Sequence, residues 1–73
     1  MSFKDMVRFR EKFNLNQADA ARILGIKNAA LVSQWETGFR SPTLVTRKFV
    51  KLLLALPTRQ TKAILKMLEA YKK

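Results

Sequence analysis

Residues 15–42 read LNQADAARILGIKNAALVSQWETGFRSP, and this stretch decides the fold. Asn16 is of the residue type that caps helix N-termini, and Gly25 is suited to end the same helix because glycine readily adopts a left-handed conformation. Asn28 is expected to cap a second helix, which ends at Gly38. The stretch therefore predicts two short helices joined by a tight turn.

The apolar side chains of this stretch fit two helices that cross closely. The expected inner faces comprise Ala18, Ala21 and Leu24 on the first helix, and Leu31, Val32 and Trp35 on the second. Ala21 is small enough to let the second helix cross the first at short range. Two helices related in this way, at about residues 17–37, have the geometry of a helix-turn-helix unit.

Another helix is expected before this unit. Met6, Phe9 and Phe13 repeat at spacings of three and four residues, which places them on one helical face. Ser2 is expected to cap this helix, and Asn14 breaks the pattern and ends it.

Two further helices are expected after the unit, over about residues 42–71. Ser41 is expected to cap the first of them, with Pro42 at the first helical position. Pro57 then ends that helix, and Thr58 is expected to cap the last one. The expected apolar residues are Leu44, Val45, Phe49, Leu52, Leu53 and Leu56, followed by Ile64, Met67 or Leu68, and Tyr71.

Length and composition indicate one all-α domain over residues 1–73. The chain is 48% hydrophobic, which argues against disorder, and two glycines and two prolines are too few for the turns of an all-β fold. It has no cysteine and no histidine, so we expect no disulfide, no metal site and no cofactor. A chain this short without such cross-links depends on an efficient helical core, on a partner subunit, or on both.

The charge is strongly basic and unevenly distributed. Fifteen Lys and Arg residues stand against five Asp and Glu residues, for a net charge of +10. Residues 1–39 carry six bases and four acids, a net +2, whereas residues 40–73 carry nine bases and one acid, a net +8. This excess points to a polyanionic partner, nucleic acid first and an anionic membrane surface second. The alternative is a solvated helix surface that serves solubility.

Neither a signal peptide nor a membrane span is expected. The first residues mix charged and apolar types, and the longest apolar run, Leu52–Leu56, is too short to cross a bilayer. We therefore expect a cytoplasmic protein without a membrane partner, associated with the nucleoid of a bacterial cell or a phage-infected host. A membrane-active cationic peptide is disfavoured because Trp35 belongs to a motif that needs a folded domain.

The central stretch resembles the Cro/C1-type (Xre-family) helix-turn-helix of phage and bacterial repressors. The resemblance covers about Arg10–Leu54 and implies a five-helix, lambda-repressor-like domain that binds double-stranded DNA and regulates transcription. One residue more than the family usually has separates the turn glycine from Val32; it is expected at Ile26-Lys27 and leaves the angle between the helices open. The matching residues are Leu15-Asn16-Gln17, Ala21, Gly25-Ile26, Val32-Ser33, Trp35-Glu36, Gly38 and Pro42.

The second helix of the unit supplies the expected contacts with DNA bases. Gln34 can pair with adenine through its amide, Ser33 can donate or accept, and an alanine methyl can pack on a thymine methyl. The expected base-contacting residues are Asn28, Ala29, Ala30, Ser33, Gln34 and Thr37. Ala29 and Ala30 are equally explained as simple helix formers, so shape and flanking basic residues are expected to add specificity.

Residues around this helix are expected to contact the DNA backbone. They are Gln17, Lys27, Arg40, Ser41, Thr43, Arg47 and Lys48. The resemblance implies that Gln17 holds a phosphate beside a helix N-terminus, although it could equally be a plain first-turn residue. Lys48 and Lys51 could equally be solvent-facing charges. The resemblance also implies an internal salt bridge between Arg10 and Glu36.

The resemblance implies a homodimeric repressor that binds an inverted repeat and regulates its own operon. The expected dimer surface comprises Leu53, Leu56, Ile64, Leu68 and Tyr71, which could equally close the monomer core. The alternative function is an antitoxin or adaptor module whose main partner is a protein. We do not expect an enzyme, because the chain has no histidine, no cysteine and no glycine-rich phosphate loop. Of its five carboxylates, Glu36, Asp5 and Asp19 have expected structural roles, so nothing remains for paired acid/base catalysis.

Overall fold

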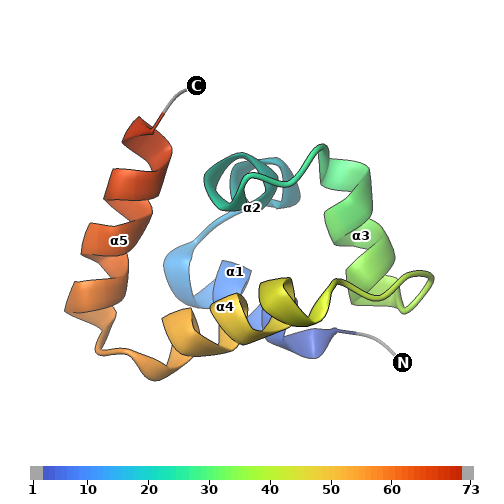
Figure 1. Ribbon diagram of the computed structural model, residues 1–73, viewed down its shortest axis with the longest axis horizontal. Helices are drawn as coiled ribbons and strands as arrows, with labels where there is room; N and C mark the ends of the chain where they lie inside the picture. Colours follow the sequence, from blue (N-terminus) through green and yellow to red (C-terminus); the bar gives the residue numbers. More distant parts are fainter. Residues whose placement is uncertain (1–2, 72–73) are drawn as a thin grey trace.

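Residues 3–71, which the computed structural model describes, form five α-helices (Figure 1). The all-α, five-helix class predicted from the sequence is confirmed. The helices are α1 (Lys4–Phe13), α2 (Gln17–Leu24), α3 (Ala29–Thr37), α4 (Leu44–Ala55) and α5 (Thr58–Ala70).

The helices enclose one core between them. α1 packs against α3 and α4, while α2 packs against α3 on one side and α5 on the other. In Figure 1, α3 stands at one end of the molecule and α5 at the other, and α4 runs between the two ends. The outer surfaces of α3 and α5 therefore face in different directions.

The capping residues predicted for α2 are confirmed. The side-chain oxygen of Asn16 accepts a hydrogen bond from the Asp19 backbone N–H at 2.7 Å, and the Asp19 carboxylate accepts one from the Asn16 N–H at 3.3 Å. This reciprocal pair satisfies two backbone donors that a helix N-terminus leaves free. Gly25 ends α2 with a φ of 73°, a left-handed conformation that side chains disfavour.

The ends predicted for α1 and α3 are also confirmed. The side chain of Asn28 accepts a hydrogen bond from the Leu31 N–H at 3.1 Å and so caps α3. Gly38 ends α3, and Asn14 ends α1 with a φ of 57°, in the left-handed region that asparagine tolerates better than most residues. Ser2, the predicted cap of α1, lies outside the described residues; the residue in the cap position is Phe3.

The predicted starts of α4 and α5 were wrong by one or two residues. Thr43 caps α4, because its hydroxyl accepts a hydrogen bond from the Thr46 N–H at 3.3 Å. Pro42 is therefore a buried residue of the preceding loop and not the first residue of the helix. At α5, Pro57 already has the extended conformation of a capping residue, so Thr58 begins the helix instead of capping it.

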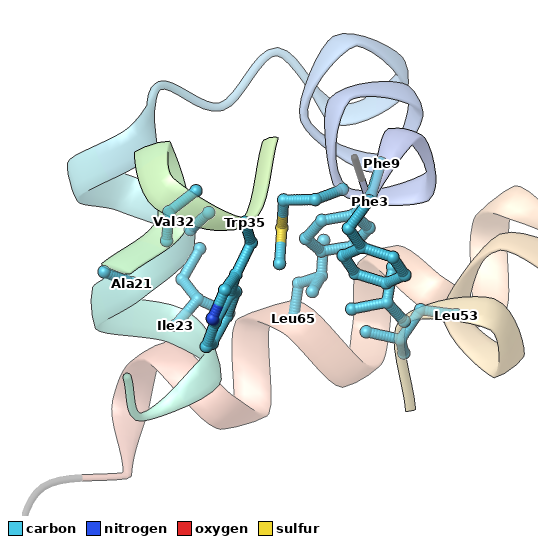
Figure 2. Close-up of a cluster of buried hydrophobic side chains, with 11 residues drawn as sticks. Phe3, Phe9, Ala21, Ile23, Val32, Trp35, Leu53 and Leu65 are labelled. Carbon is cyan, nitrogen blue, oxygen red and sulfur yellow. The ribbon is translucent and has the colours of Figure 1, made fainter. Parts of the chain in front are cut away.

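The core is a single cluster of apolar side chains drawn from all five helices. The predicted faces of α1 and α3 are confirmed, and Figure 2 shows Trp35 toward the middle of the cluster. Its buried members are Phe3, Met6, Phe9, Ala20, Ala21, Ile23, Val32, Trp35, Val50, Leu53 and Leu65.

The faces predicted for α2 and α4 were wrong in part. On α2, Ala20 and Ile23 are buried beside Ala21, whereas Ala18 is exposed. On α4, Leu53 is buried and Phe49 packs against the core, as predicted. Val50 is also buried and Leu54 also packs against the core, so the helix is rotated relative to the prediction. Leu44, Val45 and Leu52, which were expected to face the core, are exposed.

The face predicted for α5 also needs correction. Ile64 and Leu68 are half-buried and pack against the core, but the buried positions are Thr61 and Leu65. Met67 and Tyr71 are exposed, because the helix contacts α2 and α4 along its other side. One buried position of α5 is thus a threonine, Thr61, which the apolar pattern did not include among the core residues.

Buried Thr61 completes the end of α4. In a regular helix the Leu53 carbonyl would accept a hydrogen bond from residue 57, but residue 57 is a proline and has no N–H. The Thr61 hydroxyl donates to this carbonyl instead, at 2.7 Å, from a fully buried position. The bond ties α5 to α4 and satisfies an acceptor that would otherwise be buried without a partner.

We expect Thr61→Val, which keeps the side-chain shape but removes the donor, to lower the free energy of unfolding by about 1–3 kcal/mol. Thr61→Ser keeps the hydroxyl and removes one methyl group, so we expect a loss of only about 1 kcal/mol. Urea denaturation measures both. A Thr61→Val protein as stable as the unsubstituted one would contradict this role of the hydroxyl.

Candidate nucleic-acid interface

The turn between α2 and α3 accommodates four residues, from Gly25 to Asn28. The Ile26 N–H donates to the Ala21 carbonyl at 2.8 Å, and the Ile26 side chain packs against the core. Lys27 is exposed at the turn. Ile26 therefore anchors the turn to the core, and the exposed Lys27 beside it is accessible to a ligand.

α3 presents a small, uncharged outer face. Its apolar residues Val32 and Trp35 are buried, and Glu36, the one charged residue of the helix, takes part in an internal ion pair. Ala30 and Thr37 are exposed, and Ser33 lies half-buried on the same side. Small side chains allow the backbone of α3 to approach a surface closely, as entry into a DNA groove requires.

The predicted base-contacting residues were expected to be exposed, but several of them are not. Asn28 is exposed, but its side-chain oxygen is used to cap α3, so only its amide N–H groups remain available. Ala29, Ser33 and Gln34 are half-buried. The loop after α3 turns back over Gln34, since the Arg40 N–H donates to the Gln34 carbonyl at 3.2 Å.

The amide oxygen of Gln34 is enclosed and has no hydrogen-bond partner among residues 3–71. An enclosed acceptor without a partner lowers stability, so the side chain has a reason to exchange this position for one with a partner. Gln34 would therefore reach a base edge only after it leaves the position seen here.

An ion pair joins α1 to α3. The Arg10 Nε donates to Glu36 Oε2 at 2.6 Å, and Nη2 donates to Glu36 Oε1 at 2.8 Å, a two-point contact that fixes both side chains. Side-chain exposure is 20% for Arg10 and 9% for Glu36, so the pair is largely shielded from water.

The same network holds the start of α2. Arg10 Nη1 donates to the Leu15 carbonyl at 3.2 Å, and the Gln17 amide donates to Glu36 Oε1 at 3.1 Å. Three helices therefore meet at one carboxylate. Gln17, expected to bind a phosphate, is half-buried and oriented by Glu36.

The ion pair raises the pKa of Arg10 above its ordinary value, chiefly through the hydrogen bond with Glu36. A raised pKa on a base means that its contribution to stability is present at every pH below the unfolded-state value and is lost only as pH rises through the folded-state value. Arg10 therefore remains positively charged throughout the pH range in which proteins are handled, so deprotonation of Arg10 does not break the ion pair.

The residues expected to contact the DNA backbone flank α3 at both ends. Lys27 lies at the turn before α3, and Arg40, Ser41 and Thr43 lie in the loop after it. All are exposed, as are Arg47 and Lys48 on α4, whereas Gln17 is half-buried. An uncharged helix face with basic residues at its two ends matches the layout of a DNA groove between two phosphate strands.

The expected dimer surface was wrong at Leu53. This side chain is fully buried in the core, as the alternative interpretation of these residues allowed, and cannot contact another molecule. Leu56, Ile64 and Leu68 are half-buried, and Tyr71 is exposed. The sequence pattern did not distinguish the residues of α5 that contact the core from those on its exposed side. The positions of the charged residues were an available signal, because they leave one exposed side of α5 uncharged.

Residues 3–71 contain no group of three or more side chains suited to hold a metal ion. Within the same range, none of the helices is long and apolar enough to cross a membrane.

A family model described as helix-turn-helix, of the Cro/C1 type, matches residues 7–46, which is more than half of the chain. The chain belongs to this family. The match runs from α1 through the start of α4 and contains the Arg10–Glu36 pair and all of α3. The protein is a DNA-binding transcriptional regulator, as the resemblance implied, and its partner is double-stranded DNA. No curated protein and no solved structure matches the chain.

We expect Arg10→Met to destabilise this Cro/C1-type domain by about 3 kcal/mol, because it leaves the Glu36 carboxylate enclosed without its cation. Replacing both partners, as Arg10→Met with Glu36→Leu, should recover at least half of the loss, since no unpaired charge remains. Urea denaturation of the single and double variants measures the coupling.

Arg22→Met is the matched control. Arg22 also pairs with two carboxylates, those of Asp19 and Glu69, but half of its side chain is exposed. We expect a much smaller change in the free energy of unfolding, since water screens an exposed pair. Equal losses at Arg10 and Arg22 would contradict a special role for the shielded pair.

Proposed function

We propose that the protein is a homodimeric repressor that inserts α3 into the major groove of an inverted-repeat operator and represses its own operon. The observation that carries this proposal is the outer face of α3, which is small and uncharged and has exposed basic residues at both ends. Such a face can approach base edges while the flanking cations bind phosphates.

The side chains of α3 suit recognition of base edges. The hydroxyl groups of Ser33 and Thr37 can donate or accept, and the Ala30 methyl can pack on a thymine methyl. Gln34 can pair with adenine at two points once its amide leaves its enclosed position. These contacts are few, which favours a protein that reads two half-sites.

The outer side of α5 supports a dimer. It bears a stripe of exposed residues without charge, whereas Arg59, Lys62, Lys66 and Glu69 lie on other sides of the helix. On a chain of net charge +10, an uncharged stripe is where a second copy can approach with least repulsion. The α5 stripe comprises Gln60, Ala63, Met67, Ala70 and Tyr71. In a two-fold dimer the recognition helices lie about 34 Å apart, one turn of DNA.

Fluorescence-anisotropy titration against the DNA upstream of the gene, with a scrambled duplex of equal length as control, tests the proposed reading. We expect the upstream duplex to bind at least about a thousandfold more tightly. Gln34→Met should reduce this preference by about tenfold without loss of stability, because it removes one base contact and an enclosed polar atom together.

Equal and steeply salt-dependent affinity for the two duplexes would contradict a sequence-reading repressor. Absence of DNA binding would favour the other proposed role, an antitoxin or adaptor module that uses the α5 stripe to hold a different protein. An unchanged preference in Gln34→Met would contradict a base contact at Gln34.

We expect Met67→Glu to weaken the dimer by at least about tenfold, because it places a charge in the α5 stripe. Val45→Glu on α4 is the matched control, since Val45 is 77% exposed and Met67 71% exposed. Sedimentation equilibrium measures the dissociation constants. A monomeric unsubstituted protein, or equal effects of the two substitutions, would contradict the proposed interface.

A further inference from the structure

A basic groove separates the start of α1 from the start of α4. It has a volume of about 440 Å³ and is lined by Phe3, Lys4, Asp5, Ser41, Pro42, Arg47 and Lys51. Three of these described lining residues are basic and one is acidic. The groove brings together cations from helices that are far apart in the sequence, so helical spacing alone does not reveal it.

The single acid of the groove is largely neutralised. One oxygen of the Asp5 carboxylate accepts a hydrogen bond from Arg8 at 3.0 Å, and the other lies 3.9 Å from the Lys51 amino group. Asp5 is also the less exposed partner in both pairs, at 20% of its side chain. The exposed charge of the groove is therefore positive, and the contact with Asp5 holds the Lys51 amino group at the groove.

The groove lies beside the C-terminal end of α3. The Phe3 N–H donates to the Trp35 carbonyl at 2.8 Å, which holds the start of α1 against the last turns of α3. Figure 1 shows the start of α1, the loop after α3 and the first turn of α4 at the same end of the molecule. Ser41 and Pro42 of that loop form one wall of the groove.

This location fits the path of a DNA strand. When the N-terminal part of a recognition helix reads base edges in the major groove, the chain that follows its C-terminal end emerges beside a phosphate backbone. The loop after α3 is that chain here, and the basic groove continues from it toward α1. A DNA phosphate beyond the base-reading region would meet Lys4 and Lys51 from the same side as Arg47.

We propose that the basic groove binds the DNA backbone outside the bases that α3 reads, and that Lys4 and Lys51 are its phosphate contacts. The proposal rests on the binding of duplex DNA but not on the repressor role, because phosphate contacts carry no sequence information. Lys4 and Lys51 thus lengthen the DNA footprint and increase affinity for any duplex.

The salt dependence of binding to a mixed-sequence duplex tests this proposal. We expect Lys4→Gln with Lys51→Gln to reduce the slope of log K against log salt concentration by about 1.8, which corresponds to two lost phosphate contacts. The affinity deficit of the variant should then shrink about twelvefold between about 50 and 200 mM salt.

Lys62→Gln with Lys66→Gln is the charge-matched control. Both lysines are exposed on α5, at the groove between α2 and α5 that also contains Asp19 and Glu69. We expect this control to leave the salt slope unchanged. Urea denaturation of both double variants verifies that neither loses stability, since all four side chains are exposed.

A smaller slope in the Lys4/Lys51 variant alone, with the preference for the upstream duplex retained, supports the proposal. Equal slopes in the two double variants would overturn it, since only net charge would then matter. A protein with no preference for the upstream duplex would contradict the repressor role, yet the slopes on the mixed-sequence duplex would still decide whether the basic groove binds phosphates.

Discussion

The shielded carboxylate of Glu36 is the contact on which the proposed DNA-binding surface depends. Arg10 of α1 binds both of its oxygens, and Gln17 at the start of α2 binds one of them, so three helices are oriented by one group at the end of α3. Arg10 also binds the Leu15 carbonyl, which fixes the chain just before α2. A shielded ion pair adds little net stability, but its geometry is strict, and here it sets the angle at which α3 is presented.

Charged residues are unevenly distributed over the surface of the described residues. α3 carries its one charge inward and is small and uncharged outside, so it can enter a groove, while basic residues gather around its ends and on α4. α5 keeps its charges off one side, which leaves the α5 stripe for a partner. The C-terminal helix is held to the domain by Thr61, which binds the Leu53 carbonyl, and by the exposed pair of Arg22 with Glu69. In the proposed function, DNA binding and assembly therefore use different ends of the domain.

Sequence reasoning succeeded where a residue type has one physical use. Asn16 and Asn28 cap helices, and Gly25 adopts a positive φ, so the ends of α2 and α3 followed from local chemistry. It failed on α4 because Leu44, Val45, Val50, Leu52 and Leu53 surround most of the helix, so spacing could not select the buried side. Burial of Thr61 depends on a carbonyl left free by Pro57, and enclosure of the Gln34 amide oxygen depends on tertiary packing that helical spacing does not reveal. The basic groove joins residues of α1 and α4, which only the folded chain brings together.

Amide chemical-shift mapping during titration with the upstream duplex tests most directly that α3 and its flanking segments form the DNA-binding surface. We expect the largest shifts on the outer face of α3, at the start of α2 near Gln17, in the loop from Arg40 to Thr43 and at Lys4 and Lys51. We expect small shifts on the side of α5 that carries Lys62 and Lys66. The largest shifts on α5, with α3 unaffected, would contradict DNA binding through α3.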